Sequence, residues 1–382
     1  MAKFLRLYCC LATVFLLTAF SFQLGAQSFT ASVESHTSLV LSKHFSTYQV
    51  FQLDANALDA YVKSNAEAPV QLNVGAHHWR LDLTPNRILS ENYALTVQTP
   101  QGITTTYPKL NIAFKGYDLS GGGITRLTLN DEFLYGFVEE GIERYYIEPL
   151  WYFEPGAAHD RFVLYPKSAV TPLGDDACGV TDEQMELQHL EDGPDKGAAS
   201  GADNSACYEL ELAIASDLSM LNKYGSVTGV QNHNIGVIND VEVDYTGSFN
   251  NDITFIIVTQ FVASGSDPWS NSTDAGTLLD SFRAWGNAGN FGVTFDIGEL
   301  WTNRNFNGGT VGIAYLNGVC NSVKYHCLQD FTGDGELLRC MTSHEIGHNF
   351  SAVHDNNCPP NVIMCPFVSN ANKKQEWGLV IR

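Results

Sequence analysis

A short sequence near the C-terminus limits what this chain can fold into, since residues 344–355 read His-Glu-Ile-Gly-His-Asn-Phe-Ser-Ala-Val-His-Asp. Two histidines four residues apart, His344 and His348, lie one above the other on a helix, so both imidazoles can reach one ion while Glu345 lies beside the first. The helix cannot bring His354 to the same ion without a sharp turn. Three protein ligands with a fourth position left to water are typical of a hydrolytic zinc site.

The alternative interpretation is that these are ordinary histidines on a helix surface. With 11 His among 382 residues, three at fixed places occur by chance about 2 × 10⁻⁵ times per window, or in roughly 1% of chains of this length. The required Glu lowers this figure about tenfold. We therefore favour a zinc site, and we expect the chain to turn near Ser351 to deliver the third histidine.

The chain is acidic, which excludes one class of partner. Its formal net charge is −21 with only 21 Lys and Arg, so no basic stripe is available for phosphates and we expect no nucleic-acid partner. Residues 1–26 have the pattern of a secretory signal peptide, with Lys3 and Arg6 before an apolar run and small residues ending at Ala26. No later stretch is long and apolar enough to span a membrane. We therefore expect a secreted, extracellular protein with no membrane span.

Export changes how the cysteines are interpreted, because disulfides persist outside the cytosol. If Cys9 and Cys10 leave with the signal peptide, seven remain, namely Cys178, Cys207, Cys320, Cys327, Cys340, Cys358 and Cys365. Seven is odd, so at least one thiol is free or has another role.

The rest of the chain divides into two parts by composition. From about Gln27 to Tyr165, alternating and β-branched runs such as residues 94–98 are separated by turn residues, which predicts an antiparallel β domain. Residues 181–206 are rich in small and turn-forming residues and predict a linker open to proteolysis. Residues 207–382 alternate strand and helix patterns, which predicts a mixed α/β (α+β) domain.

Within this C-terminal part we predict strands at 208–214, 252–261 and 295–301, and helices at 227–243, 274–285 and 336–351. We interpret Gly312, Ile313 and Ala314 as part of an edge strand that could take an extended peptide, with a glycine-rich loop as the alternative. Residues 330–335 begin like a calcium loop, but Met341 stands where the closing Glu is required. We favour an ordinary turn, and a structural calcium ion is left open without a supporting motif.

Several of these motifs together resemble a known family. Residues 344–355 are similar to the metzincin signature HExxHxxGxxH, and Asp355 with Ile363-Met364-Cys365-Pro366 as a Met-turn resembles the reprolysin (adamalysin) branch of zinc metallopeptidases, family M12B. The β-rich part is similar to the propeptide of that branch at residues 114–117 and 145–150. The resemblance implies a metzincin-like catalytic domain with a twisted mixed sheet and an active-site helix, behind a β-rich propeptide at residues 27–180.

The resemblance also implies a role for each residue of the site. His344, His348 and His354 bind one catalytic zinc ion, Glu345 is the general base, and Met364 lies under the metal as a hydrophobic floor. The expected activity is that of a zinc metalloendopeptidase, which hydrolyses peptide bonds in proteins or peptides. We expect attack by a zinc-activated water whose proton Glu345 accepts.

The family pattern suggests a role for the odd cysteine as well. Cys178-Gly179-Val180 resembles the cysteine switch of metzincin propeptides, so the chain's own propeptide is expected to inhibit it until it is removed. Six cysteines then remain for three disulfides, although Cys207 also lies near the boundary and is an open alternative for the thiol. Asp355 is expected to orient the turn below the site through hydrogen bonds, with a role as an oxygen ligand left as the alternative.

Three features depart from the family pattern. Ser351 stands where the signature has Gly, and a left-handed backbone at this residue would cost about 1 to 2 kcal/mol. Val362 stands where a cysteine is common, which would favour a different disulfide, Cys358 to Cys365. The sequence stops at Arg382 where relatives usually continue, which favours a truncated copy. These departures keep open an alternative function, a catalytically weak or inactive secreted zinc-binding or adhesive protein of the same fold.

Overall fold

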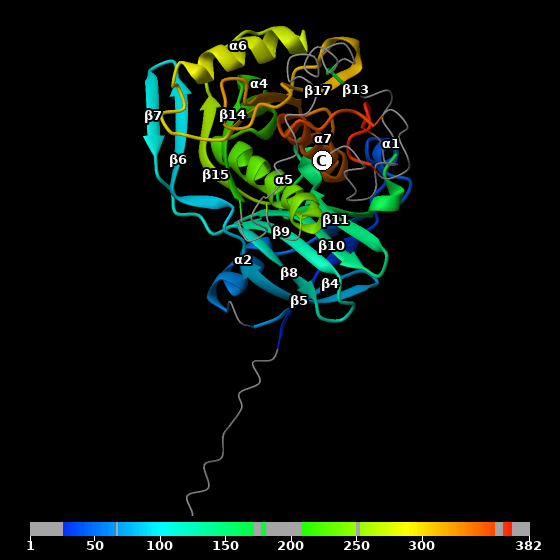
Figure 1. Cartoon of the computed structure of the whole chain (residues 1–382). Coiled ribbons are helices and arrows are strands. Elements are labelled where there is room, and N and C mark those ends of the chain that lie inside the picture. Colours follow the sequence, from blue (N-terminus) through cyan, green and yellow to red (C-terminus); the bar gives the residue numbers. More distant parts are fainter. Residues whose placement is uncertain are drawn as a thin grey trace, which may run out of the picture.

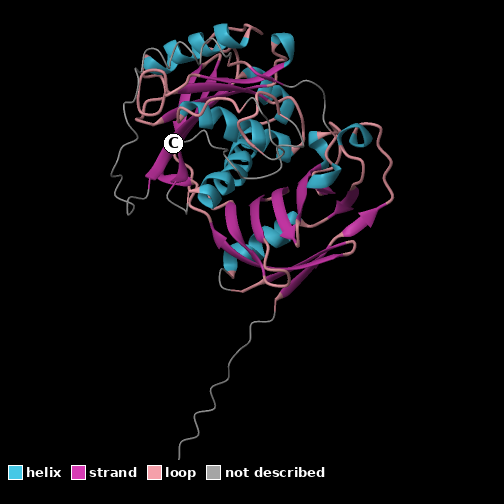
Figure 2. Ribbon diagram, turned by 45° about the vertical axis from the view of Figure 1, so that its right-hand side comes forward, coloured by secondary structure: helices cyan, strands magenta, loops and turns pink. Residues whose placement is uncertain are grey.

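Two β-sheets, one mainly from each half of the chain, organise the structure, with two long helices between them (Figure 1, Figure 2). The computed structural model describes residues 26–65, 68–171, 177–180, 208–249, 253–355 and 362–368. The expected signal peptide, apart from its last residue, and the expected linker at 181–206 lie outside these ranges. None of the helices within them is both long and apolar enough to cross a lipid bilayer.

The N-terminal half forms a ten-stranded sheet, antiparallel except that β1 and β4 are parallel. In spatial order its strands are β1 (Gln27–Thr30), β4 (Val70–Val74), β5 (His77–Pro85), β8 (Ala113–Asp118), β9 (Ile124–Asn130), β10 (Phe133–Glu140), β11 (Glu143–Pro149), β12 (Arg161–Pro166), β3 (Gln49–Gln52) and β2 (Ser32–Glu34). Alternation explains its layers, because Trp79, Leu81 and Leu83 of β5 are buried while their neighbours are not. One face packs against α2 (Ala55–Ser64), and the short helices are α1 (Leu41–His44), η1 (Leu150–Tyr152) and η2 (Lys167–Ala169).

The C-terminal half forms the centre of an eight-stranded mixed sheet. Its order is β13 (Ala177–Cys178), β17 (Thr310–Ala314), β18 (Tyr325–Gln329), β16 (Ile297–Thr302), β14 (Tyr208–Ser216), β15 (Ile253–Ala263), β6 (Leu89–Thr99) and β7 (Gly102–Thr106). The short η3 (Asn307–Gly309) precedes β17. The expected mixed α/β fold of this half is therefore confirmed, and each predicted strand lies within about two residues of an observed one.

Helices cover both faces of this second sheet. The helix α6 (Ala275–Asn287) lies on one face, and Asp274 caps it by accepting the backbone N–H of Thr277 at 2.8 Å, as the predicted start required. On the other face lie α4 (Leu218–Tyr224), α5 (Val227–Ser248) and α7 (Gly335–Asn349). The large core on this face extends into the N-terminal sheet, so both halves share it.

The strands β6 and β7 correct the prediction that residues 27–165 form a separate antiparallel domain. They come from the N-terminal half, but β6 runs parallel to β15 at the edge of the C-terminal sheet, with Ala94 opposite Thr259 and Val97 opposite Val262. Alternation of side chains shows that a segment is a strand, but it does not tell which sheet the segment joins. The prediction of a strand at residues 94–98 is therefore confirmed, but its assignment to a separate N-terminal sheet is wrong.

The helix α5 lies between the two sheets, and its residues from Val230 to Tyr245 are all buried, so this part of the helix has no exposed polar face. Some of its polar side chains have partners in the N-terminal half: Asn239 donates to the carbonyl oxygen of Leu127 at 3.3 Å, and Asn86 Nδ2 donates to Glu242 Oε2 at 2.7 Å. A helix buried on both sides needs such partners for its polar groups. The face that joins the two halves therefore combines a shared apolar core with hydrogen bonds between the halves.

Candidate metal centre

The helix α7 carries the first part of the motif, and it begins one residue before and ends two residues before the prediction. Asp334 caps it by accepting the backbone N–H groups of Glu336 at 2.9 Å and Leu337 at 3.3 Å. Every residue of the helix is buried between β17, β18, α5 and the N-terminal half. The residues 330–335 therefore form a helix cap, and Asp330 pairs with Lys223 at 2.7 Å, which supports the preference for a turn over a calcium loop.

The three histidines of the motif converge on one point, as the spacing predicted. His344 Nε2 and His348 Nε2 each lie 3.2 Å from His354 Nε2. Their ligand atoms and the Cys178 sulfur lie within 4.8 Å of one another. In the part of the chain that the structure describes, this is the sole cluster of three or more side chains able to share a metal ion.

The other ring nitrogens fix how two of these imidazoles are presented. His344 Nδ1 lies 2.8 Å from the carbonyl oxygen of Ile363, and His348 Nδ1 lies 2.7 Å from that of Ala352. A carbonyl can only accept, so both Nδ1 atoms carry the proton and both Nε2 lone pairs face the centre. Burial lowers the pKa of His344 to about 3 and that of His348 well below its usual range, so both rings are neutral.

The tight turn that delivers His354 has the predicted left-handed backbone. Ser351 has φ of 73°, where glycine is favoured. The turn is closed by the N–H of Ser351 donating to the His348 carbonyl oxygen at 2.9 Å and by the N–H of Ala352 donating to that of Gly347 at 2.9 Å. The serine therefore does not prevent the turn, and His354 reaches the other two histidines.

This arrangement fits zinc. A tetrahedral zinc ion with Zn–N bonds of about 2.0–2.1 Å holds its nitrogen ligands about 3.3 Å apart, and the observed separations are 3.2 Å. Imidazole nitrogens are donors that zinc prefers, and two of the three rings are held in the tautomer that presents Nε2. The residues present therefore suit a zinc ion with one position left for a fourth ligand.

Glu345 lies beside the three histidines with one carboxylate oxygen unused. It is 1% exposed, and its Oε2 has no hydrogen-bond partner among the described residues. Burial raises the pKa of Glu345 to about 8, which a hydrogen bond from Cys178 partly opposes. Gly312 of β17 makes room for this side chain, because a Cβ there would lie 2.4 Å from Glu345 Oε1. The glycine in the strand is thus a requirement of the site.

The run around Gly312 forms the strand β17 and not a glycine-rich loop. Its outer edge pairs in parallel with β13, and the N–H of Gly179 donates to the Gly312 carbonyl oxygen at 2.7 Å. On its other side this short segment is held by the N–H of Cys178, which donates to the Pro366 carbonyl oxygen at 3.0 Å. The segment Ala177–Val180 therefore lies as an extended peptide between β17 and the residues after Met364.

The structure brings Cys178 to the centre as well. Its Sγ lies 3.4 Å from His348 Nε2, and burial raises the pKa of the thiol well above its usual range. Cys207, the alternative thiol, lies outside the described residues, as does Cys358 of the expected Cys358–Cys365 pair. The three expected disulfides are not formed as a set, because Cys320 and Cys327 are both free thiols. Cys327 is fully buried in β18, where a thiol packs as a small apolar side chain.

The backbones of Met364 and Asp355 are hydrogen-bonded to each other next to the three histidines. Met364 is fully buried in the shared core, together with Ile346 and Ala352. The N–H of Asp355 donates to the Met364 carbonyl oxygen at 2.8 Å. This bond ties the residue after the third histidine to the Met-turn, whose Ile363 carbonyl oxygen orients His344.

Sequence reasoning missed two sets of residues that support α7. Glu299 Oε2 and Asn349 Oδ1 hold the buried His326 ring, at 3.0 Å and 2.8 Å. The signal was a carboxylate inside the predicted strand 295–301, because a buried charge needs a partner.

The second missed set comes from the N-terminal half and binds the start of α7. Glu148 Oε1 accepts the N–H of Gly335 at 2.6 Å, Tyr165 donates to Asp334 Oδ1 at 3.2 Å, and Lys167 pairs with Glu336 at 2.7 Å. Burial raises the pKa of Asp334 to about 7 and that of Glu148 well above its usual range. No local pattern could show these contacts, because they join residues far apart in the chain.

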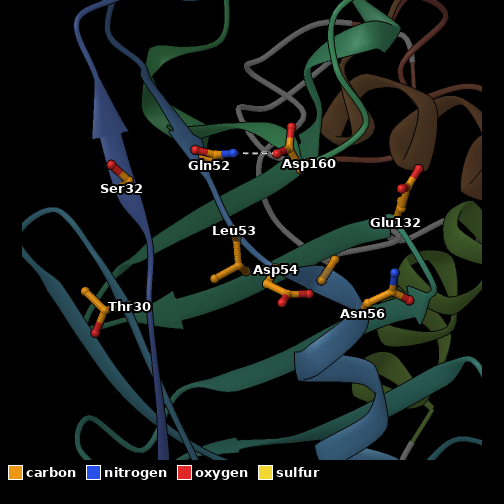
Figure 3. A pocket seen from close by; sticks show the side chains of 9 residues that line it. Thr30, Ser32, Gln52, Leu53, Asp54, Asn56, Glu132 and Asp160 are labelled. Atoms are coloured by element: carbon orange, nitrogen blue, oxygen red, sulfur yellow. Dashed lines mark hydrogen bonds between the residues drawn. The ribbon is translucent and has the colours of Figure 1, made fainter.

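A depression of about 450 Å³ lies in the N-terminal half, away from the three histidines (Figure 3). Within it Gln52 Nε2 donates to Asp160 Oδ2 at 2.5 Å. Its lining has no histidine or cysteine and consists of Thr30, Ser32, Gln52, Leu53, Asp54, Ala55, Asn56, Glu132 and Asp160. It therefore lacks the nitrogen and sulfur donors of the centre beside α7.

Comparison with known proteins agrees with the geometry of the centre. Residues 208–377 match a reprolysin family model described as metallo-peptidase family M12. The chain is also 27% identical over 308 residues to a zinc metalloproteinase-disintegrin-like protein of Cerberus rynchops, an alignment that covers 77% of this chain and 49% of the relative. The chain thus spans about half the length of that protein. With the motif and its converging histidines, these matches support a reprolysin-like metallopeptidase of family M12B.

Proposed function

We propose that the protein is a secreted zinc-dependent endopeptidase that is made as a latent precursor. The observation that carries the proposal is the convergence of His344, His348 and His354 beside the unpartnered Oε2 of Glu345. Metallopeptidases of family M12 bind zinc, and the spacing of the three Nε2 atoms suits it. Peptide hydrolysis requires a carboxylate beside such a site as a general base, whereas a protein that only binds zinc does not need one.

The three histidines would hold the zinc ion, which supplies a Lewis acid that polarises a peptide carbonyl and lowers the pKa of water. Glu345 accepts a proton from the attacking water at Oε2 and passes it to the leaving amine nitrogen. Ile363 and Ala352 keep His344 and His348 in the tautomer that the site needs, through their carbonyl oxygens. Met364 forms the buried floor of this part of the core, and Asp355 ties the turn to it.

The substrate would lie along β17, where Gly312, Ile313 and Ala314 offer backbone groups to an extended peptide. The segment Ala177–Val180 already occupies this position, with the N–H of Gly179 bonded to the Gly312 carbonyl oxygen. Strand addition of this kind gives affinity through the main chain and leaves selectivity to side-chain subsites. Proteins and peptides are therefore the proposed substrates.

Residues 27–180 would act as the inhibitory propeptide, with Cys178 as its switch, residues 1–26 as the signal peptide and residues 181–206 as the segment that is cut. In support, Cys178 Sγ lies 3.4 Å from His348 Nε2, and its peptide fills the edge of β17. The face of α5 toward the N-terminal sheet also carries polar side chains, including Asn232, Asn239 and Glu242. Such a face can be hydrated once the propeptide leaves.

Glu345→Gln tests the reaction. The full chain, processed at the linker, should contain one zinc ion and cleave a casein-like protein until a chelator is added. The variant should retain zinc but lose cleavage by about 10² to 10⁴-fold, the usual contribution of a general base. The matched control is Glu209→Gln, at an exposed position on β14 of the retained half. Equal cleavage by Glu345→Gln and wild type would sink the mechanism, and zinc without cleavage in the wild type would favour the non-catalytic alternative.

Cys178→Ser tests latency. The full-length precursor of this variant should cleave casein before processing, because the thiol is the group that reaches the histidines. Cys320→Ser is the matched control, since that thiol is exposed on another loop. If the Cys178→Ser precursor is as inactive as the wild-type precursor, the thiol is not the group that keeps the precursor latent.

A further inference from the structure

The segment that enters the metal centre carries a second buried side chain, Val180. It is 5% exposed and packs with Leu316, while Cys178 and Val353 pack against this pair. This small apolar cluster is separate from the three larger cores of the structure. Val180 therefore fills a small apolar site of its own, walled by Leu316 and Val353, and we call the space that its side chain occupies the apolar depression.

Both walls of the depression are fixed by the elements that hold the histidines. Leu316 lies just after β17, where the N–H of Asn317 donates to the His348 carbonyl oxygen at 3.1 Å and Asn349 Nδ2 donates to the Tyr315 carbonyl oxygen at 2.8 Å. Val353 directly precedes His354 in the loop that turns at Ser351. Leu316 and Val353 are therefore tied to the elements that carry His348 and His354.

The peptide reaches this depression because Gly179 lets it approach β17 closely. A Cβ on Gly179 would lie 3.1 Å from Ile313 Cβ and 3.1 Å from Thr310 Cγ2. The N–H of Val180 also donates to Cys178 Sγ at 3.4 Å, so the thiol and the valine are held as one unit. A side chain two residues from the one at the metal centre is thus directed to Leu316 and Val353.

We propose that this depression is a specificity subsite of the peptidase, which selects a branched aliphatic side chain, Val, Ile or Leu, in the substrate. The inference rests on the proposed function, because a substrate would replace Ala177–Val180 along β17. The walls are apolar, so a charged side chain would lose its hydration there without a partner. One methylene more or less in such a pocket changes kcat/KM by about 10-fold or more.

Cleavage of a mixed peptide library by the processed full chain tests the preference. Within three residues of the cut bond, one position should favour Val, Ile or Leu over Ala by about 10-fold. Leu316→Ala should shift that position alone toward Phe and Met, and Leu316→Phe should shift it toward Ala. Val293→Ala, at an exposed position of the retained half, should leave the pattern unchanged. Cleavage with the same pattern in wild type and both Leu316 variants would overturn the subsite.

A measurement on the uncut precursor needs no peptidase activity. Alkylation of Cys178, located by mass spectrometry, should be about 10-fold faster in Val180→Ala, because the valine holds the thiol segment in place. Leu316→Ala should also speed alkylation of Cys178, and adding Val180→Leu to that variant should restore the slow rate, since the larger side chain refills the space. An unchanged rate in Val180→Ala would show that the depression does not hold this segment and would overturn the inference. A wild-type protein that cleaves no peptide overturns the proposed function, and the substrate preference with it, whatever the thiol does.

Discussion

The left-handed backbone at Ser351 makes Ser351→Gly a stabilising change. A side chain at φ of 73° costs about 1 to 2 kcal/mol, because its Cβ crowds the following carbonyl. Glycine removes this cost but gains freedom in the unfolded chain, which takes back about 0.4 to 1 kcal/mol. We expect a net stabilisation of about 0.5 to 1 kcal/mol for the variant. The gain should appear where the chain turns to deliver His354.

Urea unfolding of the full chain, followed by tryptophan fluorescence, measures this change. The midpoint should rise in Ser351→Gly without a change in the slope, since the exposed surface is the same. Ser351→Ala is the matched control, because it removes the hydroxyl but keeps the Cβ, and it should gain nothing. The reasoning is refuted if the glycine variant is no more stable than the wild type, or if alanine stabilises as much as glycine.

Two further predictions concern the surroundings of α7. Gly312→Ala should lower kcat by about 10² or more with zinc content unchanged, because the new Cβ would lie 2.4 Å from Glu345 Oε1 and displace the proposed base. The control is Gly276→Ala in α6, whose Cβ would meet no atom closer than 3.7 Å. A fully active Gly312→Ala would contradict this prediction. The precursor should lose stability as pH rises from about 4 to about 7, since burial raises the pKa of Asp334 to about 7 and the folded state then binds a proton that the unfolded state has released. In Asp334→Asn, which keeps the helix cap, the urea midpoint should fall less steeply as pH rises over this range. If the midpoint falls with pH as steeply as in the wild type, Asp334 is excluded as the source of the pH dependence.

The local part of the site followed from spacing alone. Residues four apart on a helix share a face, so His344 and His348 had to meet, and the sharp turn at Ser351 followed from the need to bring back His354. Helix caps such as Asp274 are likewise written into a few neighbouring residues. Relations of this kind depend on the geometry of one element and its turn, which a sequence contains in full.

What only the tertiary structure decided lies between elements that are far apart in the chain. The position of β6 beside β15, the use of Gly312 to admit Glu345 and the grip of Glu148 on the start of α7 depend on which surfaces are buried together. A strand pattern is the same for any sheet that covers one of its faces, and a glycine has no side chain to indicate what approaches it. The sequence thus determined which donor groups meet at the centre, while the packing of the two halves determined how Glu345 is held and which segment lies along β17.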